Sequence, residues 1–166
     1  MSRTLVIQNR QRATPVDIRL LRQITETVLL ELLHIDDFEL GVTIVRASEM
    51  AALNETFLDH EGSTDVITFD YTEPEAKSNR PGAKLELHGE IFVCIDDARS
   101  QARQFRTTWQ SELARYVVHG ILHLLGHDDL RAVVRKKMKR EENRLVAKIG
   151  HLFTLSKLAR KTKLSA

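Results

Sequence analysis

Apolar residues recur along this chain with two different periods, and the alternation between them limits the folds that it can adopt. Four runs place apolar side chains two positions apart, the period of a half-buried β-strand: residues 3–8, 38–44, 64–71 and 87–95. Five other segments follow the helical period: residues 15–34, 48–58, 98–109, 111–125 and 130–149. Strands interspersed with helices predict one α/β (α+β mixed) fold, a single mixed sheet of about four strands packed with about five helices.

The predicted domain spans residues 1–150, and a loose basic C-terminal tail follows over residues 151–166. A chain of 166 residues has about the length of one domain, and no internal repeat or Gly/Ser-rich linker divides it. The single cysteine, Cys94, cannot form an internal disulfide. The sequence has no signal-peptide pattern and no apolar run long enough to span a bilayer, so we expect a cytoplasmic protein without a membrane partner.

The net charge of +2 conceals a strong asymmetry along the chain. Residues 131–166 contain twelve Lys and Arg and two acids, a net charge of +10, whereas residues 1–130 carry −8. A basic block on an acidic body is typical of proteins that bind a polyanion, most often a nucleic acid. The alternative interpretation is a solvated helix face followed by a frayed basic end.

The segment HGILHLLGHDD, residues 119–129, contains the densest group of potential metal ligands. His119 and His123 lie four residues apart on a predicted helix, so both imidazoles project from one face and can bind one ion at about 2.0–2.1 Å. Gly126 is predicted to end the helix and turn the chain, which lets a later residue return as a third ligand. The alternative is that the two histidines simply pack in the core. Gly120 stands where zinc peptidases carry their glutamate base, which argues against a peptidase.

These motifs resemble those of the YbeY family of bacterial metal-dependent endoribonucleases. The family motif H-G-x-L-H-L-x-G-[YH]-D-H is matched at every fixed position over residues 119–128. A second motif, N-x-x-[FY] followed by T-D-V-[LI]-[ST]-F, matches Asn54, Phe57 and residues 64–69, and a third, G-[DE]-I, matches residues 89–91. The resemblance implies a zinc-type ion (Zn²⁺) in a cleft, ligated by His119 and His123. It further implies cleavage of single-stranded RNA in rRNA processing and ribosome maturation, with the ribosome or ribosomal proteins as partners and no DNA.

The third metal ligand departs from the family motif, because Asp129 stands where the motif has its last histidine. A carboxylate binds zinc at about 2.0–2.2 Å, so we expect His119, His123 and Asp129 as ligands, with His127 as the alternative to Asp129. Two imidazoles and a carboxylate also suit iron or manganese. Leu58 stands where the family commonly has an arginine facing the cleft, so the phosphate contact of that arginine is not carried over.

The expected mechanism uses the open metal position to polarise a phosphate oxygen or to lower the pKa of a bound water. Asp128, His127 and Glu90 are candidates for the general base. A basic face is expected to hold the RNA backbone, and it consists of Arg135, Lys136, Lys139 and Arg140. Two other hypotheses remain: a metal-stabilised RNA- or ribosome-binding factor that does not cut, and a metallohydrolase of another substrate.

Overall fold

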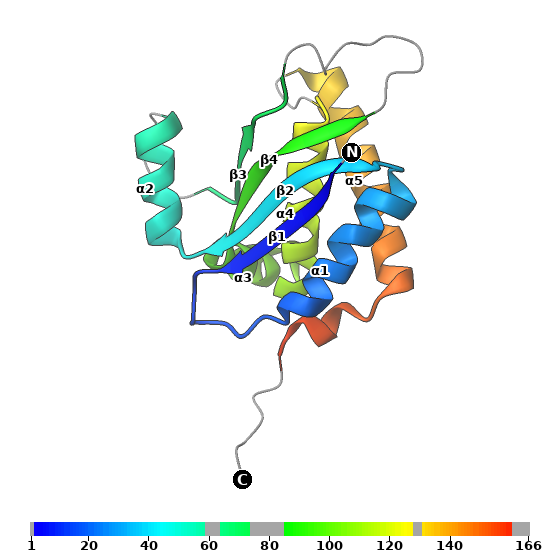
Figure 1. Cartoon of the computed structure of the whole chain (residues 1–166). Helices are drawn as coiled ribbons and strands as arrows, with labels where there is room; N and C mark the ends of the chain where they lie inside the picture. Colours follow the sequence, from blue (N-terminus) through cyan, green and yellow to red (C-terminus); the bar gives the residue numbers. More distant parts are fainter. Residues whose placement is uncertain (1, 59–63, 74–84, 128–130, 161–166) are drawn as a thin grey trace.

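The computed structural model describes residues 2–58, 64–73, 85–127 and 131–160, in which helices and strands alternate along the chain (Figure 1). Their bounds are β1 (Arg3–Asn9), α1 (Ile18–Thr27) with a π-helical turn η1 (Val28–Leu32), β2 (Asp37–Val45), α2 (Ala47–Leu58), β3 (Val66–Asp70), β4 (Glu86–Cys94), α3 (Ile95–Phe105), α4 (Trp109–Leu124), α5 (Ala132–Leu152) and a 3₁₀ turn η3 (Leu155–Leu158). Four strands and five α-helices in this part of the chain confirm the predicted α/β fold.

The four strands form one mixed sheet in the order β1-β2-β4-β3. β1 and β4 both pair with β2 in parallel, whereas β3 pairs with β4 in antiparallel fashion. The main core lies between one face of this sheet and helices α1, α4 and α5. Helix α2 packs Met50 against a smaller apolar cluster that includes Phe92 and Cys94. No described helix is long and apolar enough to cross a membrane.

Two helix boundaries differ from the prediction. Helix α1 begins at Ile18 rather than near residue 15, because Asp17 caps it by accepting a 3.0 Å hydrogen bond from the backbone N–H of Leu20. The helix predicted over residues 98–109 ends earlier, at Phe105, where the next residue adopts a left-handed conformation with φ 56°. The apolar spacing of this segment also predicts that Phe105 faces the core, but this prediction is wrong, because the residue is 61% exposed.

The chain after residue 150 is more ordered than the predicted loose tail. Helix α5 continues to Leu152, and the following turn buries Leu158 completely. The backbone N–H of Asp17 donates to the carbonyl of Leu158 at 2.8 Å, and Val16 forms an isolated bridge with Ala159. Up to residue 160 this segment closes the end of the core beside α1, while residues 161–166 lie outside the described part.

Candidate functional site

Helix α4 carries the two histidines, and its packing on the sheet fixes the side from which they project. Gly120 faces β4 so closely that a Cβ atom there would lie 2.7 Å from the Cγ2 of Ile91. A contact of that length is too short for any larger side chain, so a glutamate cannot occupy this position unless the buried Ile91 side chain or the helix shifts. The position that holds the catalytic base in zinc peptidases therefore faces the core of this protein.

His119 and His123 lie side by side on α4, as their spacing predicts. Their ring centroids are 4.8 Å apart with an angle of 75° between the planes. His119 lines a cavity between α4 and α5 and remains partly exposed. The two imidazoles are therefore close enough to bind the same metal ion.

Glu142 on α5 orients His119. Its Oε1 lies 2.7 Å from Nδ1 of His119, and its side chain is only 4% exposed. Arg115 and Lys139 donate to Oε2 at 2.7 and 2.9 Å. Burial alone raises the pKa of this carboxyl, but the hydrogen bonds from His119, Lys139 and Arg115 outweigh it and lower the pKa to about 2.

An ionised carboxylate can only accept hydrogen bonds, so the proton between the two side chains belongs to Nδ1 of His119. In its neutral form this imidazole keeps a lone pair on Nε2 for a ligand. Carboxylate–histidine pairs of this kind accompany most metal-binding histidines, because the hydrogen bond fixes the tautomer and the ring orientation. The donor set of His119 and His123 thus fits a zinc-type ion.

Glu142 was not predicted as a site residue, although its position in the sequence carries a signal. The apolar stripe of α5 consists of Met138, Leu145 and Ile149, all buried, and residue 142 falls on the same stripe. A charged residue at an inward position needs a partner, and His119 is 23 residues away in the sequence.

The turn that follows α4 forms as predicted at Gly126. Gly126 has φ +96°, and its N–H donates to the carbonyl of His123 at 3.0 Å. Within residues 2–58, 64–73, 85–127 and 131–160, no three His, Cys, Asp or Glu side chains form a group that can hold a metal, so His127 does not complete one there. Asp128 and Asp129 lie outside the described residues, and Asp129 stays a prediction.

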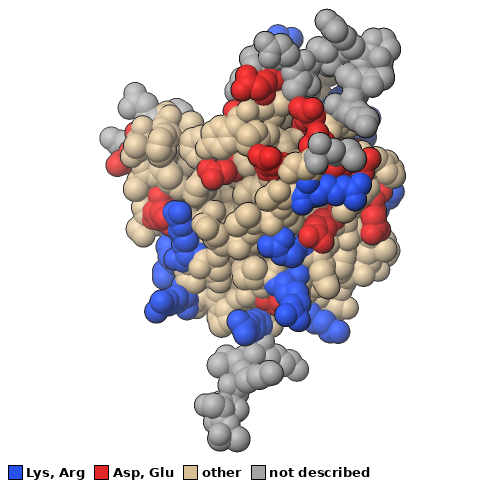
Figure 2. All heavy atoms as spheres, in the orientation of Figure 1, with Lys and Arg blue, Asp and Glu red and all other residues tan. Residues whose placement is uncertain are grey.

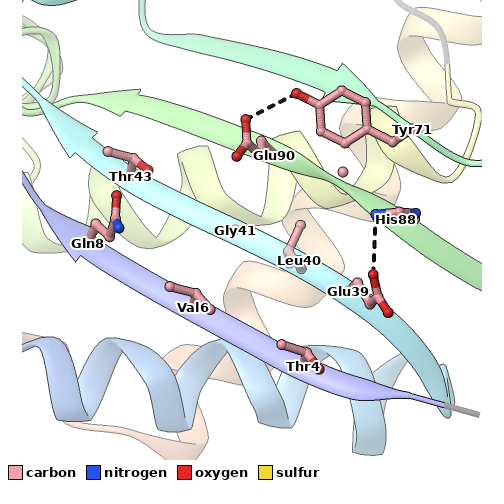
Figure 3. Close-up of a pocket in the computed structure, with 11 residues that line it drawn as sticks. Thr4, Val6, Gln8, Glu39, Leu40, Gly41, Thr43, Tyr71, His88 and Glu90 are labelled. Atoms are coloured by element: carbon pink, nitrogen blue, oxygen red, sulfur yellow. Dashed lines mark hydrogen bonds and ion pairs between the residues drawn. The ribbon is translucent and has the colours of Figure 1, made fainter.

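A second hollow, of about 310 Å³, lies on the opposite face of the sheet (Figure 3). Glu90 accepts a 3.1 Å hydrogen bond from the Tyr71 hydroxyl, and His88 Nε2 lies 3.3 Å from Glu39 Oε2. Because the neighbouring Ile91 meets α4, Glu90 points away from the helix that carries the histidines. The structure therefore separates Glu90 from His119 and removes it as a general base for chemistry there.

Figure 2 shows this open side of the molecule, where acidic side chains lie mainly over the upper half and basic ones mainly over the lower half. The described lining of the sheet hollow contains no Lys or Arg. The cavity beside His119 differs, because Arg115, Arg135 and Lys139 all line it. Two residues of the predicted basic face, Arg135 and Lys139, thus line the same cavity as His119.

Leu58 lies between the two halves of the second sequence motif, and Asp65 belongs to its second half. Leu58 ends α2 with its side chain exposed, and it offers no charge to a phosphate. Asp65 precedes β3, where its Oδ1 accepts a 2.8 Å hydrogen bond from the N–H of Val66. It also lines the cavity beside His119, so its carboxyl both orders the strand entry and faces this cavity.

Comparison with known proteins identifies the family. The family model described as Endoribonuclease YbeY matches residues 6–150. This chain belongs to the YbeY family. Two YbeY relatives, from Salinibacter ruber and Staphylococcus aureus (strain JH9), are each named "Endoribonuclease YbeY" and are 37% identical over 105 residues and 36% over 104. These alignments cover 63% and 62% of this chain, and 66% and 67% of the relatives' lengths.

The YbeY-type fold is also found in a solved structure. The solution structure of TM1509 from Thermotoga maritima is similar to this chain with a TM-score of 0.64 and 25% sequence identity. The similarity covers 98% of this chain and 99% of TM1509. It therefore includes α5, the helix that supplies Glu142.

Proposed function

We propose that this YbeY-family chain is a metal-dependent endoribonuclease that cuts single-stranded RNA in rRNA processing and ribosome maturation. The family match and the names of its relatives support RNA cleavage. The observation that carries the metal dependence is the 2.7 Å contact between His119 and Glu142, which leaves Nε2 of His119 to a ligand. We further propose that the protein acts in the cytoplasm on the ribosome or its precursors.

Three residues would hold the ion in this proposal: His119 and His123 from α4, and Asp129 from the segment that follows. Zn²⁺ suits the donor set, and an imidazole–imidazole–carboxylate set also suits iron or manganese. A bound ion of this type supplies Lewis acidity to a phosphate oxygen or to water. Glu142 holds the His119 proton on Nδ1 and keeps the ring from rotating.

The basic side chains around the same cavity give this proposal its substrate class. Arg115, Arg135 and Lys139 line the cavity, and Lys136 and Arg140 are exposed on the same helix α5. Phosphate groups of RNA bind such side chains with release of counterions. We expect the RNA backbone to run along α5 and to present one phosphate to His119 and His123.

The first experiment measures the metal content of tag-free protein by mass spectrometry, in the parent and in His119→Ala. We expect about one equivalent of metal in the parent and loss of most of it in the variant. His88→Ala is the matched control, because it removes a histidine that also contacts a glutamate but lies on the opposite face of the sheet. Asp129→Ala tests the third ligand, and retained metal in it assigns that role to another group.

Cleavage is then measured on a single-stranded RNA with chelator-treated and metal-reconstituted protein. We expect cutting only with metal, and loss of cutting in His119→Ala. Cutting that survives complete metal removal contradicts the metal-dependent mechanism. Metal binding and RNA binding without cutting by any reconstituted sample would instead identify a maturation factor that binds RNA but is not a nuclease.

A further inference from the structure

A third cavity lies where α4 begins, at the opposite end of that helix from the two histidines. It measures about 360 Å³ and is lined by the C-terminal half of α3, by the residues that join the two helices and by the first residues of α4. An α-helix rises about 1.5 Å per residue, so Trp109 in this cavity and His119 lie about 15 Å apart along α4. The cavity is therefore separate from the one beside His119.

The charge of its lining distinguishes this cavity from the other two. Two arginines, Arg99 and Arg103, line it, and its described lining contains no Asp or Glu. Carboxyl groups line both the sheet hollow and the cavity beside His119, where Glu142 already accepts from Arg115 and Lys139. Of the three cavities, this one alone presents cations without a carboxylate in the same described lining.

Arg99 and Arg103 lie one turn apart on α3, with both side chains exposed. Among the described residues, Arg103 has no hydrogen bond and no ion pair. Arg99 donates from Nη1 to Oγ1 of Thr14 at 2.8 Å, which leaves most of its five N–H donors to a ligand. Guanidinium groups at this spacing can bind the oxygens of one phosphate or of two neighbouring phosphates.

Carboxylates close to this cavity in the sequence are occupied elsewhere. Asp96 in the first turn of α3 accepts from Nε of Arg46 and, at 2.7 Å, from the N–H of Ala47. Glu112 accepts at 2.7 Å from the hydroxyl of Thr107, and it lines the cavity beside His119. Neither carboxyl group lines the third cavity, so an anion there meets the arginines without a competing acidic side chain in the described lining.

Two other segments bring further cations to this end of the molecule. Thr14, which Arg99 contacts, belongs to the loop after β1, and Val16 in the same loop forms a bridge with Ala159 near the end of the described chain. Figure 2 shows basic side chains mainly over this lower half of the molecule. We call the exposed cations of α3, of this loop and of the segment after α5 the lower basic surface, and they are Arg12, Arg99, Arg103, Arg106, Lys157 and Arg160.

Trp109 adds an aromatic ring to the arginines. Its side chain is partly buried, because it packs against the main core, and it also lines the third cavity. Sites for single-stranded nucleic acid commonly combine cationic side chains, which follow the backbone, with aromatic rings on which bases stack. An anionic membrane supplies negative charge but no base for the ring, so the lining favours a nucleic acid.

We propose that the third cavity and the lower basic surface bind the backbone of the RNA strand as an anchor, away from the phosphate that is presented to His119 and His123. The inference rests on the proposed function, from which it takes RNA as the ligand. Phosphate contacts of this kind add affinity without reading sequence. The RNA is then held at both ends of α4, and only one end carries the histidines.

The salt dependence of binding tests the anchor. Chelator-treated full-length protein is titrated into an end-labelled single-stranded RNA of about 20 nucleotides, long enough for two separate contacts, and anisotropy is followed at several salt concentrations. Each lost phosphate contact lowers the slope of log K against log salt by about 0.7. We therefore expect Arg103→Gln to lower the slope by about 0.7, and Arg99→Gln combined with Arg103→Gln to lower it by about 1.4.

Arg3→Gln is the matched control, because it removes an exposed arginine whose charge is already paired with Asp36 at 2.8 Å. We expect this variant to keep the slope of the parent. Arg103→Gln breaks no hydrogen bond or ion pair with the described residues, so loss of folding does not obscure the result. Equal slopes in the parent and the double variant overturn the proposal, and so does an equal loss in Arg3→Gln.

Fluorescence places the contact, because Trp109 is the only tryptophan in the sequence. We expect saturating RNA to quench its emission in the chelator-treated parent and equally in His119→Ala, since the anchor does not use the metal site. Unchanged emission at saturating RNA overturns the proposal. Quenching by vesicles that contain phosphatidylserine, without quenching by RNA, also overturns it and assigns the surface to a membrane.

Cleavage separates failure of this inference from failure of the proposed function. If the metal-reconstituted parent cuts RNA while the double variant keeps the salt slope and Trp109 emission is unchanged, the anchor is rejected and the nuclease stands. If RNA quenches Trp109 and the slope falls in Arg103→Gln, but no reconstituted sample cuts, the nuclease is rejected and the anchor stands as an RNA-binding surface.

Discussion

Two histidine–glutamate pairs lie on opposite faces of the sheet, and they differ in almost everything except composition. His119 and Glu142 are 2.7 Å apart in a site where the glutamate is 4% exposed. His88 and Glu39 are 3.3 Å apart on the open face, where both side chains are about half exposed. Water competes for the second pair far more than for the first, in which the glutamate is buried. Burial, rather than the residue types, is what gives one histidine a fixed tautomer.

The largest expected difference between the two pairs appears on acidification. The pKa of Glu142 lies at about 2 in the folded protein, below its ordinary 4.5. Its contribution is therefore complete above pH 4.5 and is lost as the pH falls from 4.5 towards 2, by about 3 kcal/mol at most. Urea unfolding of chelator-treated protein at pH 6 and pH 3 measures this loss.

Two variants show how much of the stability loss at low pH comes from Glu142. Glu142→Gln removes the titrating group and is expected to reduce the pH dependence between pH 6 and pH 3, whereas Glu39→Gln on the open face is expected to retain it. Parallel curves for the parent and Glu142→Gln would mean that the buried pair contributes nothing to acid sensitivity.

The second largest expected difference between the two pairs is in metal affinity. Glu142→Gln keeps the size of the side chain but removes the charged acceptor for His119, and substitutions at such positions weaken metal binding about 10- to 100-fold. Competition with a zinc chelator measures the change. Glu39→Gln is the control on the open face, and an equal loss of affinity there would break the distinction between the two pairs.

The two sheet faces also differ in how closely glycines are packed. Gly120→Ala places a methyl group 2.7 Å from Ile91, and we expect it to destabilise the protein by about 1–2 kcal/mol even after the gain in helix propensity. Gly41→Ala meets Glu90 at an ordinary 3.4 Å on the open face, and we expect a change within about 0.5 kcal/mol. Thermal unfolding of both variants decides whether only the α4 side is tightly packed.

Salt is expected to produce the smallest effect. Glu39→Ala removes the exposed partner of His88, and an exposed ion pair, which these side chains form only while His88 is protonated, contributes about 0–1 kcal/mol. We expect its small destabilisation to disappear in 1 M NaCl, where the screening length is about 3 Å. Denaturant midpoints of the parent and variant at low and high salt check this expectation, and a salt-independent loss would show that the pair acts through packing.

The sequence predicted those features that depend on local periodicity. The spacing of His119 and His123 determines that they share a helix face, whatever the helix packs against. The strands and the glycine turn at Gly126 follow from equally local signals. The family resemblance supplied the substrate class, and the third ligand, Asp129, stays a prediction.

Features that depend on competition between residues were not predictable in this way. Thr14 has the side chain of a good helix cap, but Gln11 bonds to its backbone and Asp17 caps the helix instead. Arg106 adopts a left-handed conformation although it is not a glycine, so no sequence signal marks the end of α3. The helical spacing therefore assigned Phe105 to the core. Glu142 acquires its role only when α5 packs on α4, a contact that no local pattern specifies.

The bond between His119 and Glu142 also sets an order of events during protein synthesis. The imidazole leaves the ribosomal exit tunnel 23 residues ahead of its acceptor. Until α5 has emerged and folded back, His119 has no carboxylate to select its tautomer. A nascent chain that already contains the whole sheet and both histidines therefore still lacks an oriented site. The site is therefore oriented only after α5 has been synthesised and has packed on α4.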